Sequence, residues 1–137
     1  MSDWDIRFIS LAAHVASWSK APSTKCGAVI TDANHRVISL GFNGIPRGVA
    51  DDERLNERNE KLPIILHAEA NAILFSGQAL DHATIYVWPM HPCAQCAAMI
   101  IQTGITQVVI PIHDTLVRWE ESIRQASAIL REAGVYV

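Results

Sequence analysis

Apolar residues recur at helical spacing in two long stretches, one near the start and one near the end of the chain. The first carries Trp4, Phe8 and Val15 on one predicted face, and the second carries Trp119 and Leu130 in the same way. Two shorter apolar stretches between them are each followed by a glycine, which is typical of a helix end. The predicted helices span residues 3–19, 66–76, 93–103 and 114–133.

Short runs of apolar and β-branched residues, separated by turn residues, predict strands. The first two runs flank an Asp-Ala-Asn-His turn and form a hairpin, whereas the last follows a long helix. A crossover with its own helix joins parallel strands. The pattern therefore predicts one three-layer α/β/α domain with a five-stranded mixed sheet in the order 2-1-3-4-5. The predicted strands span residues 26–31, 36–42, 84–88, 106–110 and 135–137.

A long irregular stretch over residues 43–63 separates the hairpin from the next helix. It opens with Asn-Gly-Ile-Pro-Arg-Gly and then becomes highly charged. A loop of this length in a compact domain is usually functional. We interpret its charged part, residues 53–61, as a solvated helical or irregular segment.

The composition is that of a single globular domain, because half of the 137 residues are apolar and 18% are charged. No apolar run reaches the roughly 20 residues of a membrane span, and the first residues lack the features of a signal peptide. Three cysteines are an odd number, which favours a reducing cytoplasm over a disulfide framework. The net charge of −3 argues against a nucleic-acid polymer as partner, whereas a small anionic substrate needs only one or two local cations.

Three residues, His67, Cys93 and Cys96, offer donor atoms that suit zinc. Cys93 and Cys96 lie three positions apart, so a helix places them on one face, and Pro92 suits the start of that helix. Three protein ligands leave the fourth tetrahedral position for water, which is typical of catalytic zinc sites. Glu69, two residues after His67, is the candidate carboxylate for moving protons.

Each half of this pattern has simpler explanations when it is taken alone. A single Cys-x-x-Cys could be a redox pair or half of a structural zinc site, and a lone His-x-Glu carries almost no information. Together, His-x-Glu at the start of one helix and Pro-Cys-x-x-Cys at the start of the next form the signature of zinc deaminases. We therefore expect one catalytic Zn²⁺ per chain, bound by His67, Cys93 and Cys96.

With these motifs the chain resembles the cytidine/deoxycytidylate deaminase superfamily, and within it the deoxycytidylate (dCMP) deaminase family. The resemblance is carried by residues 26–30 with 41–48, by residues 67–73 and by residues 92–97. The Gly-Phe-Asn-Gly-Ile-Pro run is the more specific pointer to the dCMP branch. The resemblance implies a cytidine-deaminase-like fold whose last two strands run parallel, and it implies that residues 1–137 form one deaminase domain.

The resemblance also implies hydrolytic deamination of a cytosine nucleotide, with dCMP to dUMP as the favoured reaction. In that reaction Glu69 carries protons between water, the base and the departing ammonia. Other substrates remain open at this point, namely a modified pyrimidine, guanine, or adenosine in tRNA. A non-catalytic zinc-binding homologue is a further alternative, although a purely structural zinc needs no Glu69. The superfamily forms dimers or hexamers, so we expect a homo-oligomer.

Candidate substrate contacts follow from the same resemblance. The asparagine equivalent to Asn43 lines the nucleoside pocket in the resembled families, although an Asn-Gly turn without a ligand is the simpler alternative. Lys25 and Arg47 are candidate phosphate contacts, although either residue alone is more often a solvated surface charge.

Asn71, one helical turn after the predicted histidine ligand, is a candidate pocket residue. In the resembled family the loop after the third predicted strand borders the base pocket, which makes Trp88 or His91 a candidate contact, and a plain loop role for His91 is an equal alternative.

The chain departs from the dCMP pattern at one point. Many members place a His-Cys pair shortly after the Gly-x-Pro-x-Gly run, where it belongs to a second zinc or regulatory region. Asp51 and Asp52 stand at the aligned positions here. This difference argues against a second zinc and against allosteric control by deoxynucleoside triphosphates.

Overall fold

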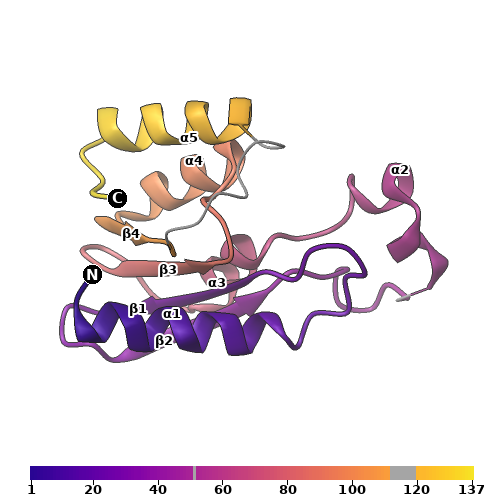
Figure 1. Cartoon of the computed structure of the whole chain (residues 1–137), viewed down its shortest axis with the longest axis horizontal. Coiled ribbons are helices and arrows are strands. Elements are labelled where there is room, and N and C mark those ends of the chain that lie inside the picture. Colours follow the sequence, from indigo (N-terminus) through magenta and orange to yellow (C-terminus); the bar gives the residue numbers. More distant parts are fainter. Residues whose placement is uncertain (51, 112–119) are drawn as a thin grey trace.

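The computed structural model describes residues 1–50, 52–111 and 120–137, and its centre is a mixed four-stranded sheet (Figure 1). The strands are β1 (Gly27–Thr31), β2 (Val37–Phe42), β3 (Thr84–Trp88) and β4 (Gln107–Val109), in the order β2-β1-β3-β4. β1 pairs antiparallel with β2 and with β3, whereas β3 and β4 run parallel. The predicted hairpin and the order of these four strands are confirmed.

The prediction of a fifth strand over residues 135–137 is wrong. The described residues form only a single parallel bridge there, between Gln107 and Tyr136. The N–H of Val108 donates to the carbonyl of Tyr136 (2.8 Å), and the N–H of Tyr136 donates to the carbonyl of Thr106 (2.9 Å). These hydrogen bonds pair one residue on each side, which is a bridge and not a strand. The chain end nevertheless lies beside β4, where the fifth strand was expected.

Helices cover both faces of the sheet, which gives the predicted α/β/α layers. Helix α1 (Asp3–Ala16) covers one face, and α3 (Ala68–Phe75) and α4 (Ala94–Thr103) cover the other. Helix α5 (Glu120–Glu132) packs against α4, as Figure 1 shows. The start of the helix predicted over residues 114–133 lies outside the described residues.

The two faces are built by alternate residues of the same strands, because successive side chains of a strand point to opposite sides. Val29 and Tyr86 pack with Phe8 of α1 in one apolar cluster. Their neighbours Ile30 and Ile85 belong to a larger cluster on the opposite side, which includes residues of α3, α4 and α5. The central strands β1 and β3 are therefore buried on both sides, as β1 shows along its whole length, whereas the edge strand β2 is partly exposed.

The long stretch between β2 and α3 contains two short turns of helix, η1 (Glu53–Asn56) and α2 (Arg58–Lys61). Figure 1 shows α2 at the end of an arm that projects beyond the sheet. An antiparallel bridge closes the base of this arm: Gly44 donates to the carbonyl of Leu66 (3.0 Å), and Leu66 donates back to Gly44 (2.8 Å). Asp51, at one position of the missing His-Cys pair, lies outside the described residues.

Among the described residues, no helix is both long enough and apolar enough to span a lipid bilayer.

Helix α3 lies unusually close to β2 because Gly41 has no side chain. A Cβ atom at this position would come within 2.4 Å of the backbone nitrogen of Ala72 and 2.5 Å of the carbonyl oxygen of Ala68. Both contacts are to helix backbone, which cannot move aside as a flexible side chain can. Ser39 adds a hydrogen bond from its Oγ to the carbonyl of Ala72 (2.7 Å). These contacts fix the position of the helix that begins at His67.

Substitution Gly41→Ala is expected to lower the free energy of unfolding by about 1–3 kcal/mol, because the added methyl group must push α3 away from the sheet. The matched control is Gly44→Ala, where a Cβ atom would meet nothing within 4 Å. Thermal and urea denaturation of both variants measure the difference. Equal stability of Gly41→Ala and the parent protein would show that the close approach does not constrain the helix.

Candidate metal centre and active site

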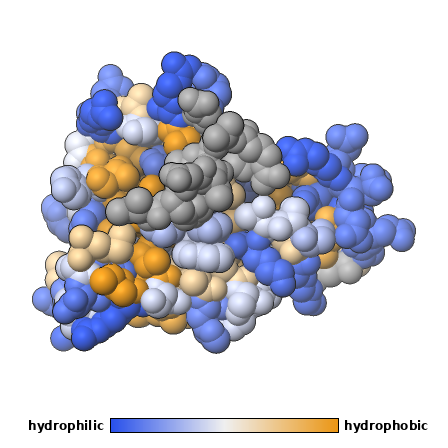
Figure 2. All heavy atoms as spheres, viewed as in Figure 1, coloured by the Kyte–Doolittle hydropathy of each residue, from blue (hydrophilic) through white to orange (hydrophobic). Residues whose placement is uncertain are grey.

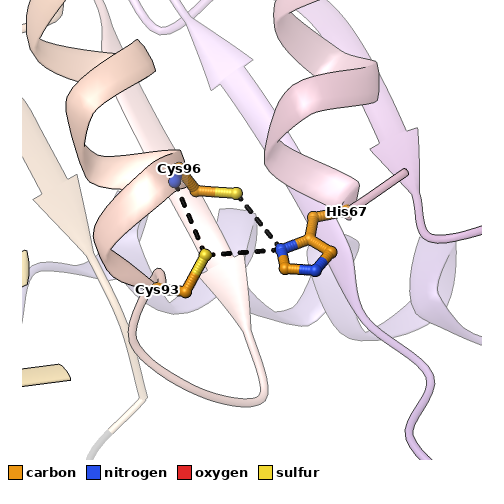
Figure 3. A group of neighbouring side chains, drawn as sticks. All are labelled: His67, Cys93 and Cys96. Atoms are coloured by element: carbon orange, nitrogen blue, oxygen red, sulfur yellow. Dashed lines mark hydrogen bonds between the residues drawn. The ribbon is translucent and has the colours of Figure 1, made fainter. Parts of the chain in front are cut away.

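Two helix starts meet at the candidate metal centre. His67 occupies the N-cap position of α3, and Cys93 occupies the N-cap position of α4. Figure 3 shows the imidazole of His67 directed toward the sulfurs of Cys93 and Cys96. The Nδ1 atom of His67 lies 3.5 Å from Cys93 Sγ and 3.3 Å from Cys96 Sγ. The Sγ atom of Cys93 also accepts a hydrogen bond from the backbone N–H of Cys96 (3.5 Å).

This donor set fits zinc in chemistry and in spacing. The three ligand atoms all lie within 4.8 Å of one another. A tetrahedral zinc ion with bonds of about 2.0–2.3 Å holds neighbouring ligand atoms roughly 3.5 Å apart, which matches the distances from His67 to the two sulfurs. One imidazole and two thiolates are also the soft and borderline donors that zinc prefers. The three side chains can therefore close around one ion without rearrangement of the backbone.

The protonation of the two thiols shows why a cation is needed between them. Hydrogen bonds from Cys96 and His67 lower the pKa of Cys93 to about 4. The hydrogen bond to Cys93, together with burial, raises the pKa of Cys96. Two neighbouring sulfurs thus share one proton when no cation compensates their charge. Zinc provides that compensation, because coordination deprotonates a thiol outright.

Glu69 lies in the first turn of α3, two residues after His67. Its side chain is almost fully buried, with 5% of the residue surface exposed. Burial is the main cause that raises the pKa of its carboxyl, and the nearby Cys93 raises it further, while His67 lowers it. A raised pKa brings the protonated and ionised forms of a carboxyl closer in free energy at neutral pH. The structure therefore brings a proton-carrying group beside the candidate metal ligands.

A cavity of about 350 Å³ opens onto these residues. His67, Glu69 and Cys93 line it, and Val87 and Met90 contribute apolar wall. This volume suits a small organic ligand with one heterocyclic ring. The walls are assembled from segments far apart in the sequence, including Ser122 and Ile123 of α5. Ser122 also accepts a hydrogen bond from the backbone N–H of Ala94 at the start of α4 (3.1 Å).

Comparison with known proteins identifies the family. A family model for the cytidine and deoxycytidylate deaminase zinc-binding region matches residues 2–112. The chain belongs to this deaminase family. The family's zinc-binding region includes all three candidate ligands, so the cofactor is Zn²⁺.

Three relatives illustrate the range of this deaminase family. An uncharacterized deaminase of Aliivibrio fischeri is 49% identical over 140 residues, which cover 100% of this chain and 93% of the relative. The deoxycytidylate deaminase of Mus musculus is 33% identical over 143 residues, covering 97% and 77%. The probable deoxycytidylate deaminase of Drosophila melanogaster is 37% identical over 118 residues, which cover 77% of this chain and 58% of the fly protein.

The fold agrees with the family. The crystal structure of the dCMP deaminase from cyanophage S-TIM5, in its apo form, superimposes with a TM-score of 0.76. The match covers 100% of this chain and 98% of the phage chain, at 24% sequence identity. At this identity the likeness shows a shared fold. It confirms the predicted cytidine-deaminase-like architecture, apart from the count of strands.

Asn43, predicted to contact substrate, lines the deaminase cavity and is 8% exposed. Its side chain also holds the neighbouring segment in place. The Oδ1 atom accepts from the N–H of Cys26 (2.9 Å), and the Nδ2 atom donates to the carbonyl of Thr24 (2.9 Å). The backbone carbonyl of Asn43 accepts from the hydroxyl of Ser19 (2.8 Å). Asn43 therefore shapes one wall of the cavity.

The other four predicted substrate residues are not among those that line the cavity. Trp88 packs with the apolar cluster under α1, because alternation along β3 directs Val87 to the cavity and Trp88 to the opposite face. Asn71 donates from Nδ2 to the carbonyl of Phe42 (2.7 Å). Lys25 is exposed, and the guanidinium of Arg47 lies over the ring of Phe75, 5.5 Å from its centroid.

The cavity is also lined by His91, which the sequence offered as an alternative to Trp88, and by Arg58 and Lys61, which it did not indicate. His91 is 7% exposed, and its Nδ1 atom lies 2.8 Å from the carbonyl oxygen of Pro92, so this contact holds the ring beside the cysteine turn. Its position just before the Pro-Cys motif was a usable signal. Arg58 and Lys61 come from the charged arm, where the sequence pattern alone indicated only a solvated segment.

Substitution Cys96→Ala is expected to reduce bound zinc well below one equivalent per chain, because two donors remain where three are needed. The melting temperature should fall by roughly 5 °C or more, since metal binding contributes to folding. Metal analysis by mass spectrometry and thermal denaturation measure both effects.

Cys26→Ala is the matched control for the loss of a thiol. Cys26 lines the same cavity, but it is not part of the three-donor group. Burial, followed by the charge of Glu69, raises the pKa of Cys26 to about 12, so this thiol stays protonated. The control should keep its zinc, and a loss of zinc in both variants alike would argue against the assigned ligand set.

Proposed function

We propose that this chain is a zinc-dependent hydrolase that converts dCMP to dUMP with release of ammonia. The observation that carries the proposal is a buried carboxyl, Glu69, in the same cavity as three zinc-binding donors. A purely structural metal site has no use for a buried acid beside it. The names of the mouse and fly relatives support deoxycytidylate as the substrate.

In this proposal His67, Cys93 and Cys96 hold the metal and leave its fourth position open to the cavity. Zinc bound there would lower the pKa of a water molecule and so supply a nucleophile at neutral pH. Glu69 accepts the proton of the attacking water and passes it to ring N3 of the cytosine. The water oxygen adds to C4. Glu69 then takes the remaining proton of that oxygen and delivers it to the exocyclic amine. The C4–N bond breaks, ammonia leaves, and the oxygen becomes the C4 carbonyl of uracil.

The environment of Glu69 supports this double role. Burial raises the pKa of its carboxyl above the ordinary range of a glutamate, so protonated and ionised forms lie closer in free energy. A group of that kind can take a proton in one step and return it in the next. The apolar contribution of Val87 and Met90 to the wall keeps bulk water from competing for the same proton.

The remaining sequence-based assignments stay predictions. Asn43 is proposed to contact the sugar with the polar atoms that its structural hydrogen bonds leave available. Lys25, Arg47, Asn71 and Trp88 stay predicted contacts that no observation above supports.

We also propose the wider setting of the enzyme. Residues 1–137 act as one deaminase domain in a reducing cytoplasm, which is consistent with free thiols at all three cysteines. The enzyme works as a homo-oligomer, either a dimer or a hexamer. Large exposed apolar side chains such as Leu74 and Phe75 provide surface for such contacts.

Substitution Glu69→Gln is expected to lower turnover of dCMP by at least about 10²-fold, because the amide cannot carry protons. Bound zinc and thermal stability should stay close to those of the parent protein, since Gln keeps the shape of the side chain. Ammonia release, metal content and melting temperature measure the three properties.

The same assay separates the alternatives. A panel of dCMP, deoxycytidine, guanine, adenosine and a modified cytosine tests the substrate, with Glu69→Gln as the inactive control. Release from dCMP in preference to the others supports the proposal. Release only from another compound would reassign the substrate, and release from none would favour a zinc-binding protein without activity.

A further inference from the structure

Among the charged residues of the described arm, only Arg58 and Lys61 line the cavity. They lie three positions apart, so they share one face of the helical turn. The acidic residues of the described arm are absent from the cavity lining; they are Asp52, Glu53, Glu57 and Glu60. Figure 2 shows the strongly hydrophilic surface of this projecting region.

One acidic residue of the arm is already neutralised within the arm itself. Asp52 accepts from the Nε atom of Arg54 at 2.9 Å, and Arg54 also donates to the carbonyl of Ala50 (3.3 Å). Arg54 thus serves the internal structure of the arm and is not among the cavity residues. The cations of the described arm that line the cavity are Arg58 and Lys61.

A contact across the cavity mouth positions one of these cations. The Nζ atom of Lys61 donates to the hydroxyl of Ser23 at 3.3 Å, which joins the arm to the segment before β1. Ser23 and Thr24 line the cavity on that side. Two cations and two hydroxyl-bearing residues therefore face the cavity together. This combination of donors is well suited to a phosphate group.

The two parts of the cavity differ in chemistry. The part formed by α3 and α4 carries the zinc ligands and Glu69, and it receives an uncharged heterocycle in the proposed reaction. The part formed by the arm carries Arg58 and Lys61, and it provides positive charge where an anionic group would lie. A nucleoside monophosphate has this same division, with a neutral base at one end and a phosphate of nearly two negative charges at the other.

We propose that Arg58 and Lys61 form a phosphate clamp that makes the enzyme select nucleoside monophosphates over nucleosides. This inference rests on the proposed deaminase function and adds the residues that set its substrate class. It reassigns the phosphate contact from Lys25 and Arg47, which do not line the cavity. Arg58 and Lys61 are within the lining of the cavity, so their charges act on a ligand bound there at shorter range than those of Lys25 and Arg47.

The test compares the reaction product with its phosphate-free form on the zinc-loaded protein. Calorimetric titration measures the affinity for dUMP and for deoxyuridine in the parent protein and in Arg58→Ala and Lys61→Ala. Each variant should lose at least about tenfold in affinity for dUMP, because a charged hydrogen bond to phosphate is removed. The affinity for deoxyuridine should be unchanged.

Matched controls remove the same charge at other places. Arg36→Ala and Arg131→Ala remove exposed charges outside the cavity lining, and both should bind dUMP as the parent protein does. Ser23→Ala removes the partner of Lys61 but keeps its charge, so it should weaken dUMP binding less than Lys61→Ala does. Arg58→Lys keeps the charge and should recover part of the affinity that Arg58→Ala loses. The dUMP affinity of the parent protein should also fall more steeply with salt than that of either alanine variant.

Several outcomes would overturn the clamp. One is normal dUMP affinity in both Arg58→Ala and Lys61→Ala, and another is an equal loss of dUMP and deoxyuridine binding, which would mean general damage to the cavity. Equal affinity of the parent protein for the two ligands, or binding of neither, would also overturn it. Ammonia release from dCMP by the parent protein tests the reaction separately. If release is absent while dUMP binding depends on both cations, the proposed reaction fails and the clamp stands.

Discussion

The close contact between α3 and β2 determines where the chemistry of this protein can occur. Gly41 allows the helix backbone to approach the strand so closely that a methyl group would not fit between them. The same helix begins at His67, and its first turn carries Glu69. Because α4 begins at Cys93 on the same face of the sheet, the two helix starts converge on one point. The positions of three metal ligands thus follow from backbone packing rather than from flexible side chains.

The donor set and Glu69 affect each other through burial and charge. Two thiols close together cannot both ionise without a compensating cation, as the opposite shifts of Cys93 and Cys96 indicate. Burial of Glu69 disfavours its charged form and raises its pKa. A divalent cation at the ligand set relieves the repulsion between the sulfurs and favours the ionised carboxylate. Metal binding at the three ligands and the ionisation of Glu69 are therefore electrostatically coupled.

The spacing of residues within the two sequence motifs was enough to predict the three metal ligands. His67, Cys93 and Cys96 converge because each lies at or near a helix start that the sequence already indicated. The hairpin and the three layers followed from residue periodicity. The fifth strand was predicted from its apolar residues, but the described chain pairs there only through the bridge between Gln107 and Tyr136. No local pattern at residues 135–137 contains that information.

The cavity wall was harder to predict, because it depends on long-range packing. Trp88 follows the site-facing Val87 by one position, and the alternation of a strand is enough to direct it to the opposite face. Arg58 and Lys61 lie in a segment whose composition is typical of solvated surface. Only the path of the arm, closed at its base by Gly44 and Leu66, brings them to the cavity. Sequence distance to a motif was therefore a poor guide to the substrate contacts.

Zinc X-ray absorption spectroscopy of the purified protein tests the central claim most directly, because it reports the atoms bound to the metal. The account predicts two sulfur atoms at about 2.3 Å, together with one nitrogen and one non-protein oxygen at about 2.0 Å. Addition of a competitive ligand that reaches the fourth position should change only the oxygen contribution. A zinc ion bound by four protein sulfur and nitrogen atoms, with no exchangeable position, would contradict it.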